Sequence, residues 1–283
     1  MLLGTATTPT AQVTDQPTTA PTYDPRPTLD IILSNGYLRC GMDTNETYRF
    51  QLCRAVAAVV FGDPAEKYEF VKLSSTDRFV KLQNGHVDLL LFSDTHTMER
   101  EMNERTTGKG FTFSDPYSFS GLVYLGNETY VKCAEQQIRY EQCQFLKICV
   151  GIDSTHKEIL NQVFPSDFMV DVSFEEMPAF LLNGTCNALV TDSPDELVDE
   201  IAREANGTVG GIPYVGDKYL AMEPLAAVTR QNDREYSDIV NWAINSMKYA
   251  EAKNITKDDS MCIPYEKKKP SALDLDFMRA VHW

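Results

Sequence analysis

Short apolar segments alternate with amphipathic segments along this chain, and the alternation occurs twice. In the first half, period-2 and buried-strand patterns predict strands at residues 37–42, 68–73 and 87–92, with helices between them at 50–61 and 78–84. In the second half, strands are predicted at 147–152, 169–172 and 187–191, and helices at 155–163, 173–182 and 194–204. Alternation of this kind is typical of α/β domains with parallel strands. We therefore expect two α/β lobes with mostly parallel sheets.

The two halves also resemble each other in detail. Residues 79–91 and 179–190 both run from a helix through an Asn-Gly pair into a strand. Further strands at 119–125 and 224–229 precede a final helix at 234–250, which we expect to return the chain to the first lobe. The predicted organisation is a disordered Thr/Pro-rich stalk at 1–28, lobe 1 at 29–123 plus 225–256, lobe 2 at 124–224, and a tail at 257–283.

Composition narrows the class of partner. The formal net charge of −15 over 283 residues argues against nucleic acid or an anionic membrane as a partner. No apolar run approaches the roughly 20 residues that cross a bilayer, and the first residues contain no readable signal peptide. Seven cysteines and five glycosylation sequons nevertheless predict an extracellular or extracytoplasmic location; the sequons are at Asn45, Asn127, Asn183, Asn206 and Asn254.

Several short motifs occur in a fixed order along the chain. They include Leu38-Arg39-Cys40-Gly41, Leu82-Gln83-Asn84-Gly85, Cys149-Val150-Gly151, Asn183-Gly184-Thr185-Cys186 and Glu223-Pro224-Leu225. This series resembles the amino-acid-binding members of solute-binding protein family 3, and most of all the general L-amino-acid-binding proteins of ABC transporters, over roughly residues 29–256. The resemblance implies a two-lobed type II periplasmic-binding-protein fold with a ligand cleft between the lobes. It also implies a protein that is not an enzyme and holds no cofactor.

The first candidate binding segment follows the buried strand at 87–92, where ligands of open α/β sheets bind. Arg100 matches the carboxylate-binding arginine of the family, and Thr95 matches its supporting threonine. A guanidinium holds a carboxylate with two parallel hydrogen bonds. The alternative is a surface arginine in the charged turn Glu99-Arg100-Glu101. Arg105 is a weaker candidate because it is out of register with the motif.

The second candidate segment opens the helix at 155–163. Ser154 and Thr155 match the family's carboxylate-binding Ser/Thr pair, although capping of the helix explains them equally well. Asp153 replaces a glycine of the family motif and brings a negative charge close to the pair. Asp192 matches the acid that binds the ligand ammonium, with capping of the next helix as the alternative.

The sequence departs from the family pattern before the first helix. Residues 43–50 form a much shorter loop than the family's, which ends in an aromatic residue over the ligand. Tyr48 or Phe92 is a candidate for that aromatic wall, and Ser93 is a candidate ligand contact next to Thr95. Because the altered segment forms the side-chain pocket, the identity of the ligand stays open.

The cysteines allow many pairing schemes. On the implied fold, Cys149 and Cys186 occupy neighbouring strands, and the pairs Cys40–Cys53 and Cys133–Cys143 are further candidates, which leaves Cys262 over. The four histidines have no ligand spacing to one another or to cysteines, so no metal site is expected; they are His86, His96, His156 and His282.

Three functions fit these observations. The first is binding of a small amino-acid-like solute by closure of the lobes, for uptake with a membrane transporter or for sensing. The second is the ligand-binding ectodomain of a membrane receptor, tethered by the stalk. The third, a dehydratase-like enzyme on the same fold, has least support because no acid/base pair matches the family.

Overall fold

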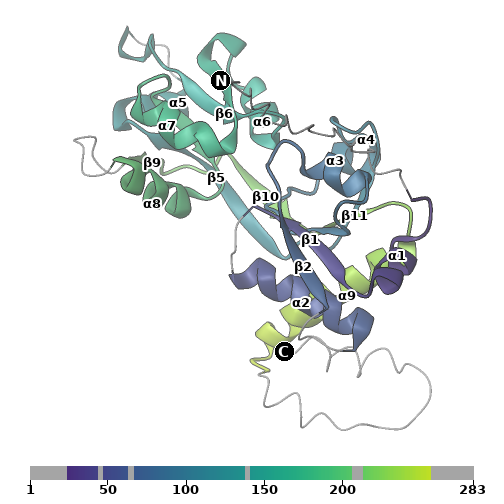
Figure 1. Cartoon of the computed structure of the whole chain (residues 1–283). Coiled ribbons are helices and arrows are strands. Elements are labelled where there is room, and N and C mark those ends of the chain that lie inside the picture. Colours follow the sequence, from purple (N-terminus) through teal and green to yellow (C-terminus); the bar gives the residue numbers. More distant parts are fainter. Residues whose placement is uncertain (1–23, 44–46, 63–66, 138–140, 206–212, 256–283) are drawn as a thin grey trace, which may run out of the picture.

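The computed structural model describes residues 24–43, 47–62, 67–137, 141–205 and 213–255, which form two sheet-centred halves (Figure 1). The first sheet has the strand order β2-β1-β3-β11-β4. Its strands are β1 (Leu38–Met42), β2 (Tyr68–Lys72), β3 (Leu89–Leu90), β4 (Phe111–Phe113) and β11 (Val228–Arg230). β1 pairs in parallel with β2 and β3, whereas β11 is antiparallel to β3 and β4.

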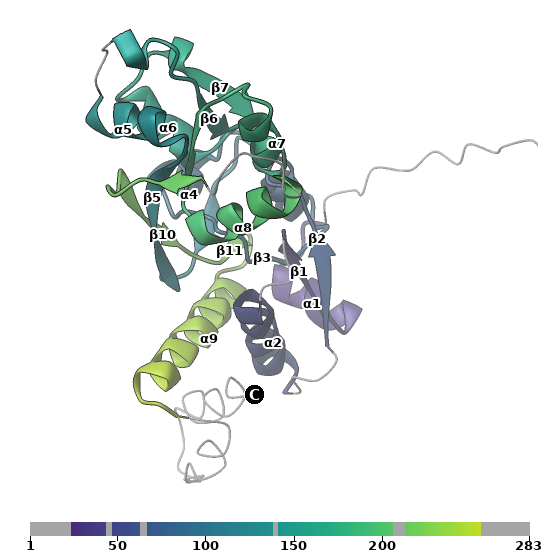
Figure 2. The ribbon, with the colours of Figure 1, turned by 90° about the vertical axis from the view of Figure 1, so that its left-hand side faces the viewer.

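Helices cover both faces of the first sheet. They are α1 (Thr28–Asn35), α2 (Thr47–Phe61), α3 (Arg78–Gln83), α4 (Met98–Asn103) and α9 (Arg234–Ala252). Successive strand residues point to opposite faces, so Leu89 joins the core under α2 and α9 while Leu90 joins the core under α3. Figure 2 shows α2 and α9 side by side below this sheet, in agreement with their many contacts.

The second sheet has the order β10-β5-β8-β6-β7, and β9 pairs with β5 off this path. Its strands are β5 (Ser118–Gly126), β6 (Ile148–Gly151), β7 (Met169–Val172), β8 (Ala188–Thr191), β9 (Tyr214–Val215) and β10 (Ala221–Leu225). Its helices are α5 (Glu128–Gln136), α6 (Thr155–Asn161), α7 (Met177–Leu182) and α8 (Pro194–Ala205). All four residues of β6 are buried, as in a strand that is covered on both faces.

The chain crosses between the halves beside the paired strands β5 and β10. A single strand was expected at 224–229, and this is wrong, because the chain changes sheets after Leu225. Between the two strands, the N–H of Ala226 donates to the carbonyl of Asp94 at 3.0 Å and that of Ala227 to Ser114 Oγ at 3.1 Å. Backbone groups at this crossing are therefore satisfied outside either ladder. The proposed lobe boundaries lie in or beside these strands and stay a prediction.

Three disulfides are present, and they are the three pairs expected from the sequence: Cys40–Cys53, Cys133–Cys143 and Cys149–Cys186. Cys262, Asn45, Asn206, the tail and most of the stalk lie outside the described residues. The sequon asparagines Asn127, Asn183 and Asn254 are exposed. In the described ranges, no helix combines the length and apolar character needed to cross a membrane.

Candidate functional site

A cavity of about 350 Å³ lies where the two halves meet, and residues from both halves line it. The first half contributes Arg49, Lys72, Arg78, Arg100 and Asp43 to the lining, besides neutral residues. The second half contributes Glu175, Asp192, Glu196, Glu200 and His156. One wall is thus mainly cationic and the other mainly anionic. A field of this kind favours a small ligand that is positive at one end and negative at the other.

Arg100 is the central cation of the first wall. It lies on α4, whose N-cap Thr97 accepts a hydrogen bond from the Arg100 backbone N–H at 3.2 Å. The side chain is 8% exposed; its Nη1 donates to the Thr95 carbonyl at 2.8 Å, and its guanidinium lies 5.3 Å from the centre of the Phe79 ring. Burial, together with the nearby charge of Arg78, lowers the pKa of Arg100. Among the described residues no carboxylate forms an ion pair with Arg100, so this buried cation is suited to an anionic group of a ligand.

The neighbouring Arg78 has a carboxylate of its own. Its Nε donates to Asp94 Oδ1 at 2.7 Å, and the Asp94 side chain is fully buried. The Arg78 guanidinium also lies over the rings of Phe79 and Phe92, at 4.7 and 5.6 Å from their centres. Arg78 is therefore a paired, structural cation of the wall, in contrast to Arg100.

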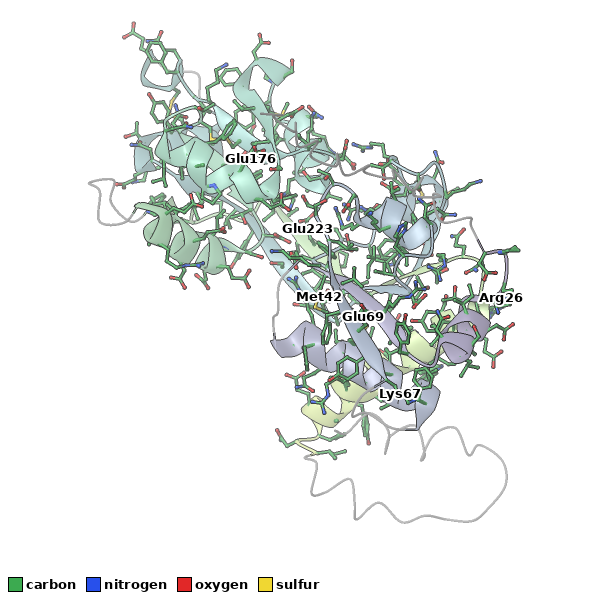
Figure 3. All side chains as sticks on the ribbon, in the orientation of Figure 1. Arg26, Met42, Lys67, Glu69, Glu176 and Glu223 are labelled. Carbon is green, nitrogen blue, oxygen red and sulfur yellow. A yellow bond between two sulfur atoms is a disulfide. The ribbon has the colours of Figure 1, made fainter. Side chains whose placement is uncertain are left out.

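The two halves are joined inside the cavity region by Glu223 on β10, which Figure 3 shows at the junction of the halves. Its Oε1 accepts hydrogen bonds from the hydroxyls of Thr155 at 2.6 Å and Thr95 at 3.2 Å, and these two hydroxyls are 3.3 Å apart. Its Oε2 lies 2.9 Å from His156 Nε2. Burial alone would raise the pKa of Glu223, but the hydrogen bonds from His156, Thr155 and Thr95 outweigh it and the pKa is lowered.

The second wall contains the predicted pair and the predicted acid. Ser154 caps α6: its Oγ accepts from the Lys157 N–H at 3.2 Å and donates to the Gly151 carbonyl at 2.7 Å. Asp192 follows β8, and its Oδ1 lies 4.0 Å from His156 Nε2. Burial raises the pKa of Asp192, although the nearby His156 acts in the opposite direction.

Most of the predicted residues thus meet at one cavity, but two do not. Ser93 lines it and accepts a hydrogen bond from Arg49 Nη2 at 2.8 Å. Tyr48 does not line this cavity; its ring lies 5.7 Å from that of Tyr117 in an adjoining hollow. Arg105 also lies outside, where it pairs with Glu99 at 3.0 Å.

Asp153 is exposed and has a φ of 56°, a left-handed conformation that glycine adopts freely and aspartate tolerates. It is not among the residues that line the cavity, so its charge does not face the interior. The substitution at the family's glycine position therefore keeps the backbone turn.

Glu223 and His156 are the residues for which the sequence analysis gave no binding role. Glu223 was part of a motif, but its partners are 67 to 128 positions away along the chain. Only the crossing of β10 between the halves brings them together.

Comparison with known proteins places this geometry in context. No protein-family model matches the chain. The putative amino-acid ABC transporter-binding protein YhdW of Escherichia coli K12 is 27% identical over 252 residues, which is 82% of this chain and 69% of YhdW. The general L-amino acid-binding periplasmic protein AapJ of Rhizobium johnstonii is 26% identical over 249 residues, 81% of this chain and 68% of AapJ. The chain is similar to amino-acid-binding proteins of ABC transporters. The resemblance inferred from the motifs is thereby confirmed, and these relatives are transporter binding proteins rather than enzymes.

A solved structure supports the fold. The periplasmic binding protein of an ABC transporter from Brucella ovis, with glutathione bound, superposes with a TM-score of 0.70 at 22% identity, covering 91% of this chain and 87% of that one. The predicted α/β fold of a periplasmic-binding protein is confirmed.

Proposed function

We propose that the protein binds a small amino-acid-like solute in the cavity between its halves and presents it, outside the cytoplasm, to an ABC transporter. The observation that carries the proposal is Arg100, a buried guanidinium that lines the cavity and forms no ion pair with a carboxylate of the described residues. The names of the relatives, amino-acid-binding proteins of ABC transporters, agree with it.

The ligand is held at two ends. Its carboxylate binds the Arg100 guanidinium through two parallel hydrogen bonds, next to the hydroxyls of Thr95 and Thr155. Its ammonium binds Asp192 on the opposite wall. Burial raises the pKa of Asp192, which means that the ionised carboxylate is poorly stabilised in the empty cavity. A ligand ammonium beside it favours the ionised form and supplies that stabilisation.

Closure of the halves over the ligand is part of the proposal. Several contacts already span the cavity in this structure. They are the Thr95–Thr155 hydroxyl contact, the Arg105–Glu158 ion pair and the hydrogen bonds between Ser75 and Glu175. These contacts support a closed arrangement of the halves, and the two crossings next to β5 and β10 are the positions where we expect opening to bend the chain.

Uptake and sensing use the same binding chemistry, and the transport role of the relatives favours uptake. A receptor ectodomain would carry the same cavity. We place the receptor second because the name of YhdW refers to an ABC transporter.

Calorimetry with a panel of acidic, polar, apolar and basic amino acids tests the proposal. Arg100→Ala should lose at least about 100-fold in affinity for the best ligand, the scale of losing one partner of a buried charge pair. Arg100→Lys should lose most of it as well, because an ammonium cannot form the two parallel bonds. Arg234→Ala is the matched control, since Arg234 is exposed on α9, lies outside the cavity and forms none of the contacts that span it. Folded protein that binds no amino acid, or equal affinity in Arg100→Ala, would overturn the proposal.

A further inference from the structure

A cluster of three potential metal ligands lies on the acidic side of the cavity. His156, in the first turn of α6, meets Asp192, which follows β8, and Glu223 on β10. One ligand atom from each residue can be chosen so that all three lie within 4.8 Å of one another. His156 Nε2 is 2.9 Å from Glu223 Oε2 and 4.0 Å from Asp192 Oδ1.

The cluster is buried and rich in negative charge. The side chains of His156, Asp192 and Glu223 are 5%, 12% and 3% exposed. Two carboxylates this close together and out of water repel each other and lose their hydration, so a cation between them stabilises both. Of the nearby arginines, Arg78 pairs with Asp94, and Arg100, whose Nη1 donates to the Thr95 carbonyl, forms no ion pair with the cluster among the described residues.

We propose that His156, Asp192 and Glu223 form a binding site for a zinc-class divalent cation. One imidazole nitrogen and two carboxylate oxygens are a ligand set that zinc accepts, at distances of about 2.0–2.2 Å. Two ligands of one such ion lie roughly 3–4 Å apart. The 4.0 Å separation from Asp192 fits this range, and Glu223 Oε2, now hydrogen-bonded to Nε2 at 2.9 Å, has to move outward slightly when an ion replaces that hydrogen bond. The imidazole selects zinc, nickel or copper over magnesium and calcium, which prefer oxygen alone.

The surroundings orient the ligands and leave room for one more. The hydroxyls of Thr95 and Thr155 bind Glu223 Oε1, which turns Oε2 toward the imidazole. Hydrogen bonds of this kind fix the ligands of metal sites. His156 and Asp192 both line the cavity, so the open coordination position of the ion faces it.

The metal site goes beyond the proposed function; the two share Asp192 as a binding residue and the hydroxyls of Thr95 and Thr155 as neighbours. It concerns the metal alone and requires no amino acid. The two can therefore fail separately.

Calorimetry with zinc chloride on chelator-treated protein is the test. The background is Cys262→Ser, because Cys262 belongs to none of the three disulfides and a thiol also binds zinc. We expect one zinc per chain and no comparable binding of calcium or magnesium. His156→Gln, Asp192→Asn and Glu223→Gln should each weaken zinc binding by at least about tenfold.

His96→Gln is the matched control for adventitious binding. His96 is a surface histidine paired with a carboxylate, Glu101, at 3.3 Å, and it is not in the cluster. Zinc affinity should be unchanged in this variant. Absence of zinc binding by folded protein, or undiminished binding in His156→Gln, would overturn the inference. If Glu223→Gln does not fold, the other two variants decide.

The amino-acid titration is repeated in the presence of chelator. An amino acid that binds there through Arg100 while zinc binds nowhere refutes the metal site and leaves the proposed function intact. Zinc binding that depends on His156 in a protein that takes up no amino acid gives the opposite result.

Discussion

Each wall of the cavity presents side chains from the first turn of a short, capped helix, and the two walls carry opposite charges. The first wall presents Arg100 from the short helix α4, capped by Thr97, and the second presents Thr155 and His156 from the short helix α6, capped by Ser154. Four cationic side chains line the first wall, whereas four carboxylates line the second. The short capped helices determine where these side chains lie, and the residues at those positions determine the charge of each wall.

The walls also differ in how their charges are balanced. On the first wall, Asp94 neutralises Arg78 and leaves Arg100 available. On the second wall, Asp192 lies next to the cavity, while Glu223, at the junction of the halves, is held by hydroxyls and by His156. Each side thus has one charged group with a charged or hydrogen-bonding partner of its own and one that faces the cavity. This division can be tested wall by wall.

The largest effect is expected from unbalancing the cationic wall. Asp94→Asn removes the carboxylate of a buried ion pair and leaves the guanidiniums of Arg78 and Arg100 together. The free energy of unfolding should fall by about 3–5 kcal/mol, measured by denaturant titration. A bound carboxylate ligand should stabilise the Asp94→Asn variant by more than it stabilises the wild-type protein.

Glu99→Gln provides the control for Asp94→Asn. Glu99 pairs with Arg105 on the surface, where both side chains are 42% exposed. Its loss should cost less than about 1 kcal/mol. Equal costs for the two substitutions would show that the cationic wall does not depend on Asp94.

The next largest effect is the loss of stability when one disulfide is removed from either half. Cys149–Cys186 closes 37 residues of the second half, and Cys40–Cys53 closes 13 residues of the first. Loop-closure entropy gives losses of about 4 and about 3 kcal/mol when each pair is replaced by alanine. Thermal unfolding of the two double variants measures the order. A larger loss from the shorter loop would mean that lost packing, and not chain entropy, dominates.

The same contrast shows what the sequence could predict. Strands such as β6 and long helices such as α9 have a strong apolar periodicity, and both were predicted within two residues of their bounds. α4 was missed because it has only six residues and its two apolar side chains, Met98 and Met102, are exposed, whereas the side chain that it buries is that of Arg100. Periodicity cannot find a helix whose buried face is an arginine.

The site was predictable only where one segment carries the signal. Thr95, Arg100, Ser154, Thr155 and Asp192 each belong to a local motif that precedes or follows a strand. The link between them is Glu223, which contacts both walls from a third segment. A buried glutamate in a strand has no local signature, so its role depends on the tertiary fold.

A smaller effect, of opposite sign, is expected on the acidic wall. Burial raises the pKa of Asp192 above 3.8, so the carboxyl binds its proton more tightly in the folded chain. Its contribution to stability is present below pH 4 and is lost as the pH rises through the folded pKa. Asp192→Asn should therefore stabilise the empty protein at pH 7 by roughly 1–2 kcal/mol and have little effect below pH 4.

Thermal unfolding of wild type and Asp192→Asn at pH 3.5 and pH 7 measures this difference. Ligand affinity should fall in the same variant, because the ammonium loses its carboxylate. A variant that is less stable at pH 7 would mean that Asp192 supports the fold and is not held for a ligand.

The smallest effect is expected from the N-caps of the two short helices. Thr97 accepts a hydrogen bond from the first turn of α4, and Ser154 accepts one from the first turn of α6. Removal of either acceptor by substitution to alanine should cost about 0.5–1 kcal/mol of stability.

If the caps serve only the helices, the two variants should lose stability equally and keep ligand affinity. If they position the binding residues, Thr97→Ala should weaken binding through Arg100 beyond its cost in stability, because the backbone N–H that Thr97 holds is that of Arg100. The N–H that Ser154 holds belongs to Lys157, which does not line the cavity, so Ser154→Ala should weaken binding less. Calorimetry and denaturant titration on the same two proteins separate the outcomes, and equal loss of affinity in both would show that the two walls are positioned alike.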